Sequence, residues 1–265
     1  MPFTPSHAVV ALPFLRTPLV PAALAVGAMS PDLPLFVRVG LPSYGITHDP
    51  AAIGLTVSLA LGLLLVWRCV LRPAARELAP SWVACRLPQG WDGTAGDALR
   101  ETFGVERGRV RVRSVGLLML SLGLGILSHI AWDAFTHEGR AGVAVIPALA
   151  AQWGPLLGVK WLQHGSSLIG LVILAGWAVR RLIRAETSPI ARVLPTWVRV
   201  AWLTALPLAL VVAWGSGLAM YGPLDAGFTI AHLAYRVLPP ACAVWAAMTL
   251  ALAIAAQWLR SRAAT

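Results

Sequence analysis

The chain alternates between long apolar runs and shorter segments that are rich in arginine, proline and glycine. A helix that crosses a bilayer needs about 20 predominantly apolar residues. Apolar runs of about that length occupy residues 52–71, 115–134, 165–183, 198–219 and 237–259. We therefore predict an all-α, polytopic helical membrane protein with about five transmembrane helices.

The first 29 residues are apolar as well, but Arg16 and several prolines interrupt them. A proline inside a helix removes a backbone hydrogen bond and tends to break the helix. The pattern predicts two short helices, over residues 6–13 and 19–29, that form an N-terminal hairpin at the outer face instead of a span. A cleaved signal peptide is the alternative, although no basic segment precedes the apolar stretch.

Composition supports the membrane interpretation, and the distribution of charge suggests an orientation. Only 12% of the residues are charged, against about 25% in soluble domains. The net charge of +10 comes from arginines concentrated in residues 72–114, in 180–199 and at the C-terminus, with few in the loops between. This alternation follows the positive-inside rule, so the arginines indicate which loops are cytoplasmic and do not indicate nucleic-acid binding.

We accordingly predict a multi-pass protein of the bacterial plasma membrane whose basic loop, 72–114, and C-terminus are cytoplasmic. Residues 28–51, 137–164 and 220–236 then lie outside. Residues 1–265 are expected to form a single integral membrane domain. The long loops 72–114 and 137–164 are rich in turn residues, so little regular structure is expected in either. In the first loop, "ERGRVRVRS" alternates charge with valine, so a short strand is the alternative there.

A polar stripe at the end of the second apolar run carries the strongest chemical signal. The sequence "SHIAWDAFTH" spaces His129, Asp133 and His137 four residues apart, which places neighbours in the series on one helix face, about 6 Å apart along the axis. His129 and His137 would be about 12 Å apart on a continuous helix. Either two ions share Asp133 as a bridge, or the helix ends near Phe135 and His137 folds back. Ionisable residues inside a span are functional by default.

Other potential ligands fall on the same predicted outer side: His7, Asp32, His48 and Asp49. Together with the stripe, they give a proposed ligand set of His7, Asp32, His48, His129, Asp133 and His137. Imidazole combined with carboxylate favours zinc as the divalent ion, with iron or manganese as alternatives. Asp32 or Asp49 is a candidate general base. The competing interpretation is that the histidines are amphipathic residues at the membrane–water interface and bind no ion. For His164 this interpretation and a functional role are equally open.

Four sequence blocks resemble an uncharacterised bacterial membrane-protein family known as domain of unknown function 4184. The blocks are "MPFTPSHAVVALP", "GAMSPDLP", "SHIAWDAFTHEG" and "LQHGSSLIGL". In this order they cover most of the chain.

More distantly, the chain is similar to predicted membrane-bound metal-dependent hydrolases, whose pattern is an N-terminal histidine, a "PD" turn, "TH" and then "SHxxxD". It departs from that pattern where relatives often read "PDxDH", since this chain reads "PDLPLF". The order of ligand types is also similar to that of the zinc-dependent phospholipases C, which are all-helical with several zinc ions. Their later His-x-x-x-Glu is absent, because Leu168 stands four residues after His164.

These observations give a leading hypothesis and two alternatives. The first is a metal-dependent hydrolase of phosphoesters or lipid headgroups, with membrane lipid as its partner and substrate source. The second is a non-enzymatic metal-binding or transport protein, which should place carboxylates and histidines deep in several spans. The third is a structural protein that binds no metal.

Overall fold

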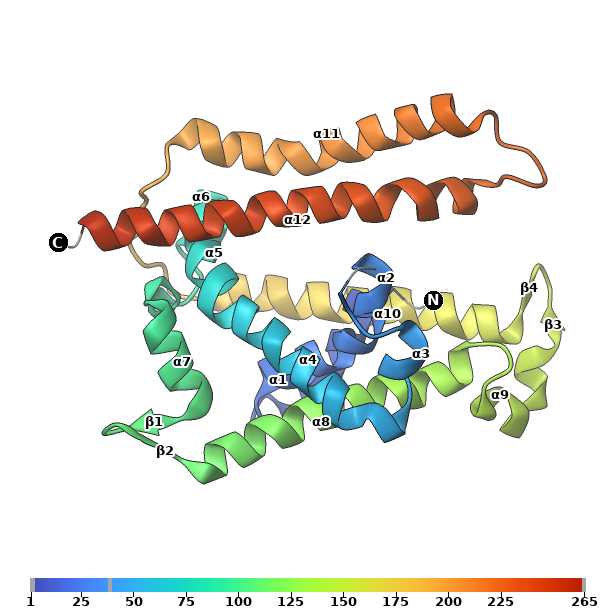
Figure 1. The fold of residues 1–265 in the computed structure, drawn as a ribbon, viewed down its shortest axis with the longest axis horizontal. Coiled ribbons are helices and arrows are strands. Elements are labelled where there is room, and N and C mark those ends of the chain that lie inside the picture. The colour runs from blue at the N-terminus through green and yellow to red at the C-terminus, as the bar shows by residue number, and fades with distance from the viewer. Residues whose placement is uncertain (1–2, 38–39, 264–265) are drawn as a thin grey trace. The chain divides into compact units, whose positions relative to one another are not determined.

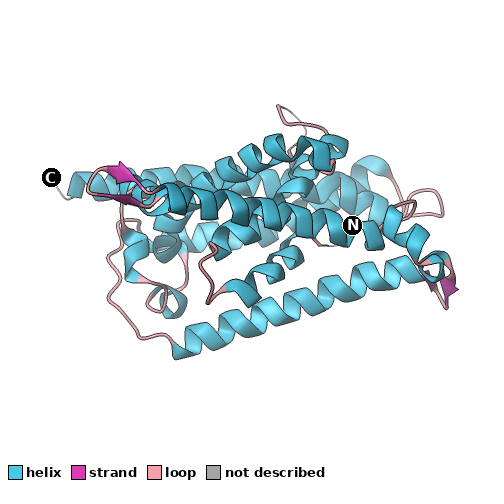
Figure 2. Cartoon of the chain, turned by 90° about the horizontal axis from the view of Figure 1, so that it is seen from below, coloured by secondary structure: helices cyan, strands magenta, loops and turns pink. Residues whose placement is uncertain are grey.

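The structure is a computed structural model that describes residues 3–37 and 40–263, and 76% of it is helical (Figures 1 and 2). Its helical elements are η1 (Thr4–Phe14), α1 (Pro21–Met29), η2 (Ser30–Asp32), α2 (Leu33–Phe36), α3 (Tyr44–Thr47), η3 (Pro50–Ala52), α4 (Ile53–Val66), η4 (Trp67–Leu71), α5 (Arg72–Leu78), α6 (Ser81–Ala84), η5 (Gln89–Asp92), α7 (Ala95–Phe103), α8 (Val112–Thr136), α9 (Ala141–Val145), η6 (Pro147–Ala150), α10 (Gly158–Arg184), α11 (Thr196–Tyr221) and α12 (Ile230–Ala263). Two short antiparallel hairpins pair β1 (Val105–Glu106) with β2 (Arg109–Val110) and β3 (Gln152–Trp153) with β4 (Leu156–Leu157).

Five helical segments in the described part of the chain are long and apolar enough to cross a membrane. They are Pro50–Leu78, Val112–Thr136, Gly158–Arg184, Thr196–Tyr221 and Ile230–Ala263. Each contains or overlaps one of the apolar runs predicted above, which confirms the all-helical, multi-pass fold class. No more than 33% of the apolar window of any of these segments is buried inside the protein, as expected of helices that face lipid.

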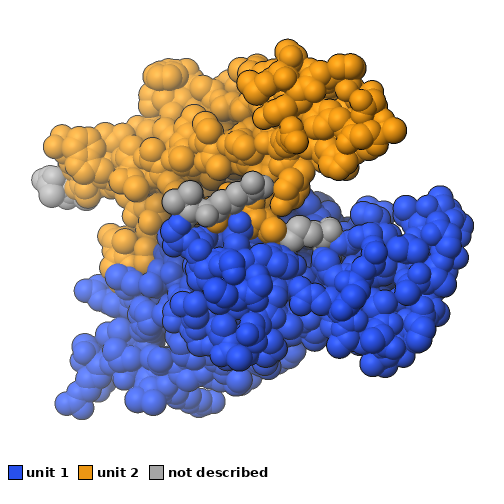
Figure 3. Space-filling view, turned by 45° about the vertical axis from the view of Figure 1, so that its right-hand side comes forward, with its two compact units in different colours: residues 1–34, 38–66, 99–184 blue, residues 35–37, 67–98, 185–265 orange. Residues whose placement is uncertain are grey.

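The chain folds into two compact units, which are coloured separately in Figure 3. Unit 1 comprises residues 1–34, 38–66 and 99–184, and unit 2 comprises residues 35–37, 67–98 and 185–265. All candidate site residues belong to unit 1. The expectation of one integral membrane domain stays a prediction.

Unit 1 is built around α8, against which α1 packs closely. A Cβ on Gly27 would lie 2.4 Å from the carbonyl oxygen of Leu122, and a Cβ on Gly125 would lie 2.3 Å from that of Leu24. The two helices therefore approach backbone to backbone, as small residues allow between membrane helices. Val20 reinforces the contact, because its N–H donates to the hydroxyl of Ser121 at 2.9 Å.

The N-terminal hairpin is present, with its two helices at residues 4–14 and 21–29. The first two residues of the predicted hairpin lie outside the described part. Its placement at the outer face stays a prediction. The contacts with Ser121 and Leu122 lie near the middle of α8, so the hairpin runs alongside a spanning helix. The glycines that permit the crossing determine this position.

Unit 2 pairs α11 with α12 and packs α5 on α12 (Figure 1). Trp202 stacks on Trp245 with a centroid distance of 5.2 Å, and its indole N–H donates to Thr249 Oγ1 at 2.9 Å. Glu77 is fully buried; it accepts the backbone N–H groups of Val193 and Leu194 and pairs with Arg260 at 3.2 Å. These contacts tie the ends of three distant segments together.

The two long loops have more regular structure than the turn-rich sequence predicts. Within residues 72–114 the helix of the first span continues to Leu78, and α6, η5, α7 and the β1–β2 hairpin follow. Thr94 and Asp97 form a reciprocal capping box at the start of α7, with both backbone N–H bonds at 3.1 Å. Arg107 and Gly108 both have positive φ, as a tight two-residue hairpin turn requires.

The loop 137–164 is likewise partly ordered. It contains α9, η6 and the β3–β4 hairpin, and α10 begins at Gly158. Gly154 provides the positive φ of 67° for the turn between β3 and β4. The expectation of little regular structure is therefore wrong for both loops, because short capping and turn signals outweigh their high content of glycine and proline.

Candidate metal site

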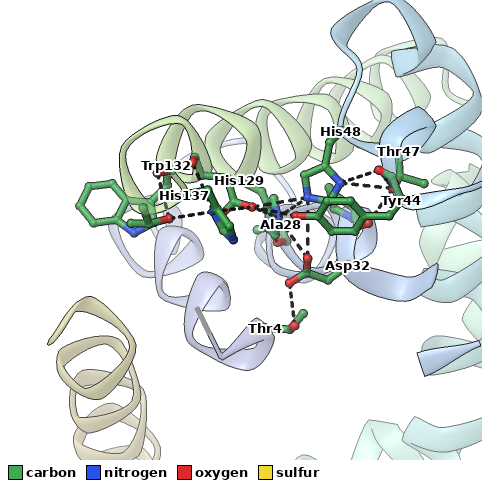
Figure 4. Close-up of polar contacts among 12 residues, drawn as sticks. Thr4, Ala28, Asp32, Tyr44, Thr47, His48, His129, Trp132 and His137 are labelled. Carbon is green, nitrogen blue, oxygen red and sulfur yellow. Dashed lines mark hydrogen bonds and ion pairs between the residues drawn. The ribbon is translucent and has the colours of Figure 1, made fainter. Parts of the chain in front are cut away.

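Four predicted ligands come together in unit 1, and they come from three separate segments of the chain. Asp32 ends η2, His48 follows α3, and His129 and Asp133 lie one turn apart on α8. One potential ligand atom from each of the four lies within 4.8 Å of the corresponding atoms of the others. All four residues are buried. Figure 4 labels three of the four, Asp32, His48 and His129, whose side chains point toward one another.

The imidazoles of His48 and His129 are oriented by backbone carbonyls. His48 Nδ1 lies 2.9 Å from the carbonyl oxygen of Tyr44, and His129 Nδ1 lies 2.7 Å from that of Ala28. A carbonyl oxygen can only accept, so each Nδ1 carries the hydrogen. In the neutral rings, both Nε2 lone pairs then face the cluster, where they lie 3.2 Å apart. Metal-binding histidines are commonly held in this way.

The two carboxylates surround these lone pairs. Asp32 Oδ1 lies 3.6 Å from His129 Nε2 and 3.7 Å from His48 Nε2. Asp133 Oδ2 lies 3.4 Å from His129 Nε2 and 3.5 Å from His48 Nε2. Two carboxylates and two imidazole lone pairs in one buried space repel each other unless a cation lies among them. The donor set therefore fits a divalent metal ion.

Unpartnered polar atoms point to the same conclusion. Among the described residues, Oδ1 of Asp32 and of Asp133 and Nε2 of His7 and of His137 are buried without a hydrogen-bond partner. Buried polar atoms are normally paired, so four such atoms around one cluster require an explanation. A bound cation would supply one for the atoms within its reach.

His7 and His137 adjoin the cluster without belonging to the group of four. The ring of His7 lies against that of His129 with a centroid distance of 4.2 Å and an interplanar angle of 33°. Its burial, reinforced by the nearby His129, lowers the pKa of His7 to about 4. α8 ends at Thr136, and the extended His137 folds back so that its Nδ1 lies 3.5 Å from Asp133 Oδ2. The spacing left open either a continuous helix or a helix that ends near Phe135 with His137 folding back. The structure has the second arrangement.

Asp49 lies apart from the cluster although it follows His48 directly. Its side chain is exposed and accepts the N–H of Ala51 at 2.9 Å, so it caps η3. Its role as a general base stays a prediction. His164 is exposed on α10 and also lies outside the group.

Sequence reasoning missed the polar residues that support the ligands. Thr4 donates its hydroxyl to Asp32 Oδ2 at 2.7 Å, which leaves Oδ1 facing the cluster. The phenol of Tyr44 lies 3.5 Å from Asp133 Oδ2, and burial together with that carboxylate raises the pKa of Tyr44. Tyr44 stands four residues before His48, and Thr4 stands three before His7. Such helical spacing from a predicted ligand is the signal that could have identified both.

Comparison with known protein families identifies the family of the chain. A family model described as "Domain of unknown function (DUF4184)" matches residues 1–257. The chain belongs to the DUF4184 family. Every potential ligand of this DUF4184 protein lies inside the matched region. Neither the curated proteins nor the solved structures include a match to the chain.

Proposed function

We propose that this protein is a membrane-bound, metal-dependent hydrolase that acts on phosphoesters or lipid headgroups. The observation that carries the proposal is the buried cluster of Asp32, His48, His129 and Asp133, whose ligand atoms converge within 4.8 Å. The proposal also accords with the resemblance to the predicted membrane-bound metal-dependent hydrolases and to the zinc-dependent phospholipases C. The site faces the outer side in this proposal, as the arginine distribution predicts.

The spacing of the ligand atoms favours zinc. Zinc binds imidazole nitrogen and carboxylate oxygen at about 2.0–2.2 Å in tetrahedral sites, so two ligand atoms should lie about 3.3–3.6 Å apart. The imidazole–imidazole and imidazole–carboxylate distances in the cluster run from 3.2 to 3.7 Å. Iron and manganese remain the alternatives because they accept the same ligands. His7 and His137 are proposed as additional ligands, with Asp133 available to a second ion through its other oxygen.

A divalent ion held here would act as a Lewis acid on a phosphoryl oxygen and lower the pKa of a bound water toward neutrality. The protein's own contribution is orientation. Thr4 fixes one oxygen of Asp32, so the other is available as a ligand or as a general base. Tyr44 is neutral and can donate a hydrogen bond to Asp133 or to a substrate oxygen. Asp49 would have to leave the N-terminus of η3 to act as a base.

The test is the metal content of the purified protein in detergent, measured by elemental mass spectrometry beside two carboxamide variants. Wild type should retain about one or two equivalents of zinc, iron or manganese, in line with one- and two-metal hydrolytic sites. Asp133→Asn should lose the metal, whereas the matched control Asp49→Asn should keep it. A protein that stays metal-free after zinc is supplied would refute the proposal.

Activity then separates the hydrolase from the alternatives. The metal-loaded protein is assayed with bis-p-nitrophenyl phosphate and with phosphatidylglycerol in mixed micelles, and phosphate-ester cleavage is followed. Cleavage lost in Asp133→Asn supports the hydrolase, and the effect of Asp49→Asn on cleavage tests Asp49 as the general base. Metal binding without cleavage of any phosphoester supports the non-enzymatic metal-binding or transport protein instead.

A further inference from the structure

A large cavity in unit 1 lies beside the metal cluster. Its volume is about 800 Å³, and its walls come from η1, α8, α10 and the β3–β4 hairpin. We call it the α10 groove and define it by the lining residues His7, Val10, Trp132, Trp161, Gly165 and Ile173. A volume of this size is typical of pockets that hold an organic ligand, and the lining is mostly apolar.

The character of the lining changes along α10. Trp161 and Ser166 lie toward the start of the helix, and Ile169 and Ile173 follow deeper in the apolar run. Trp132 and Trp153 lie at the same end, because the indole N–H of Trp161 donates to the carbonyl oxygen of Trp153 at 2.7 Å and that of Trp132 donates to Ser166 Oγ at 3.2 Å. Tryptophans gather where membrane meets water. The groove therefore runs from an interfacial end toward the hydrocarbon region.

The dimensions match one leaflet of a bilayer. From Trp161 to Ile173 the groove follows 12 residues of helix, which is about 18 Å at 1.5 Å per residue. Half of a hydrocarbon core is about 15 Å thick. A further helix of about 10 Å diameter and the same length would occupy about 1,400 Å³, which exceeds the groove. An extended hydrocarbon chain suits the space better than a protein helix does.

His7 joins the groove to the metal cluster. Its side chain lines the groove, its ring lies against that of the potential ligand His129, and its Nε2 is buried without a hydrogen-bond partner. It is 9% exposed, so this atom is hidden from bulk water. Ser128, the residue before His129, lines the same space. A molecule in the groove would thus lie with one part against the cluster's edge.

We propose that the α10 groove binds one acyl chain of a membrane lipid and presents that lipid's phosphoester to the metal cluster. This inference rests on the proposed hydrolase function and makes its substrate a lipid. Val9, Val10, Ile169 and Ile173 contact the chain, and the tryptophans lie at the level of the glycerol and headgroup. The lipid enters sideways from the leaflet, since α8 and α10 are both membrane-spanning helices.

A photo-crosslinking experiment tests the groove without requiring turnover. The full-length protein is reconstituted in vesicles of phosphatidylethanolamine and phosphatidylglycerol that contain phosphatidylglycerol with a diazirine at the end of one acyl chain. After irradiation, labelled residues are mapped by mass spectrometry. We expect label at Val10, Ile169 and Ile173 severalfold above that at Val172 and Val179, which are exposed on α10 but do not line the groove.

Two glycines of α10 provide matched variants. A Cβ at Gly165 or at Gly176 meets nothing within 4 Å, but only Gly165 lines the groove. Gly165→Phe should fill the groove and remove the excess label, whereas Gly176→Phe should leave it unchanged. Circular dichroism and the detergent elution profile establish that both variants fold.

The outcomes separate this inference from the proposed function. Label spread evenly over α10 and unaffected by Gly165→Phe would overturn the groove as an acyl site, even if the protein binds metal. Groove residues protected from label in wild type would also overturn it, because another occupant would then fill the space. Asp133→Asn should keep the groove label, since the chain and the ion bind to different residues. Loss of metal binding with retained groove labelling would refute the hydrolase alone.

Discussion

Gly125 on α8 determines how closely α1 can approach α8. Gly125→Ala therefore tests whether this close approach positions the metal cluster. The added Cβ would lie 2.3 Å from the carbonyl oxygen of Leu24 and 2.8 Å from the backbone nitrogen of Ala28. Ordinary carbon contacts begin at about 3.4 Å. α1 would therefore have to move away from α8 by about 1 Å, because backbone atoms cannot rotate aside as a flexible side chain can.

The displacement reaches the cluster through one hydrogen bond. The carbonyl oxygen of Ala28 accepts the Nδ1 hydrogen of His129 at 2.7 Å. A shift of about 1 Å would lengthen this contact to roughly 3.7 Å, beyond the upper limit of about 3.2 Å for such a bond. Overpacking typically costs about 1–3 kcal/mol. Loss of a carbonyl that orients a metal-binding imidazole costs about 10–100-fold in metal affinity.

The matched control is Gly123→Ala, two residues away on the same helix, where a Cβ meets nothing within 4 Å. Alanine there should be neutral or stabilising by up to about 1 kcal/mol, since it favours helix. Thermal unfolding in detergent and zinc titration are measured for both variants. We expect a lower melting temperature and weaker zinc binding in Gly125→Ala alone. Equal stability and equal zinc affinity in the two variants would refute the close crossing and its link to His129.

Three further predictions follow from other parts of the chain. Glu77→Ala should destabilise the protein by about 3–5 kcal/mol in denaturant unfolding, because it removes a fully buried carboxylate that pairs with Arg260 and accepts the N–H groups of Val193 and Leu194. The exposed Glu106→Ala should cost at most about 1 kcal/mol; similar losses in the two variants would contradict this role of Glu77. A membrane-impermeant maleimide should label Arg140→Cys in intact cells and Arg107→Cys only after permeabilisation, and the reverse pattern would invert the predicted topology. Chelation should remove the stabilisation that the bound ion provides, about 2.7 kcal/mol at a free ion concentration 100 times the Kd. It should therefore lower the melting temperature of wild type and leave that of Asp133→Asn unchanged. An equal shift in both proteins would show that the chelator does not act through this site.

The spanning helices were predictable because their signal is local. An apolar run of about 20 residues needs no information from the rest of the chain, and all five predicted runs correspond to long helices. The pair formed by His129 and Asp133 was predictable for the same reason, since helical periodicity fixes which residues share a face. By contrast, the capping box at Thr94 and the turn at Arg107 depend on one or two residues and were outweighed by composition.

The membership of the cluster could not be predicted in full, because it depends on how separate segments meet. Asp32 and His48 reach α8 only through the packing of the N-terminal hairpin and the short helices that follow it. The neighbours His48 and Asp49 illustrate the limit. His48 points its Nε2 at His129, whereas Asp49 turns its carboxylate to the N–H of Ala51. Two adjacent polar residues thus have different roles, one in the cluster and one as a helix cap, and the local backbone conformation determines which role each has.

The arrangement around His48 and His129 also bears on how the cluster could hold an ion. Each ring donates its Nδ1 hydrogen to a carbonyl oxygen, so each presents a bare Nε2 to two carboxylates. Protonating both rings would balance the charge but would place two imidazolium N–H groups 3.2 Å apart. One shared divalent cation would satisfy all four groups at once and relieve the repulsion. The carbonyls of Tyr44 and Ala28 fix the tautomer whose Nε2 lone pair a metal ion could use.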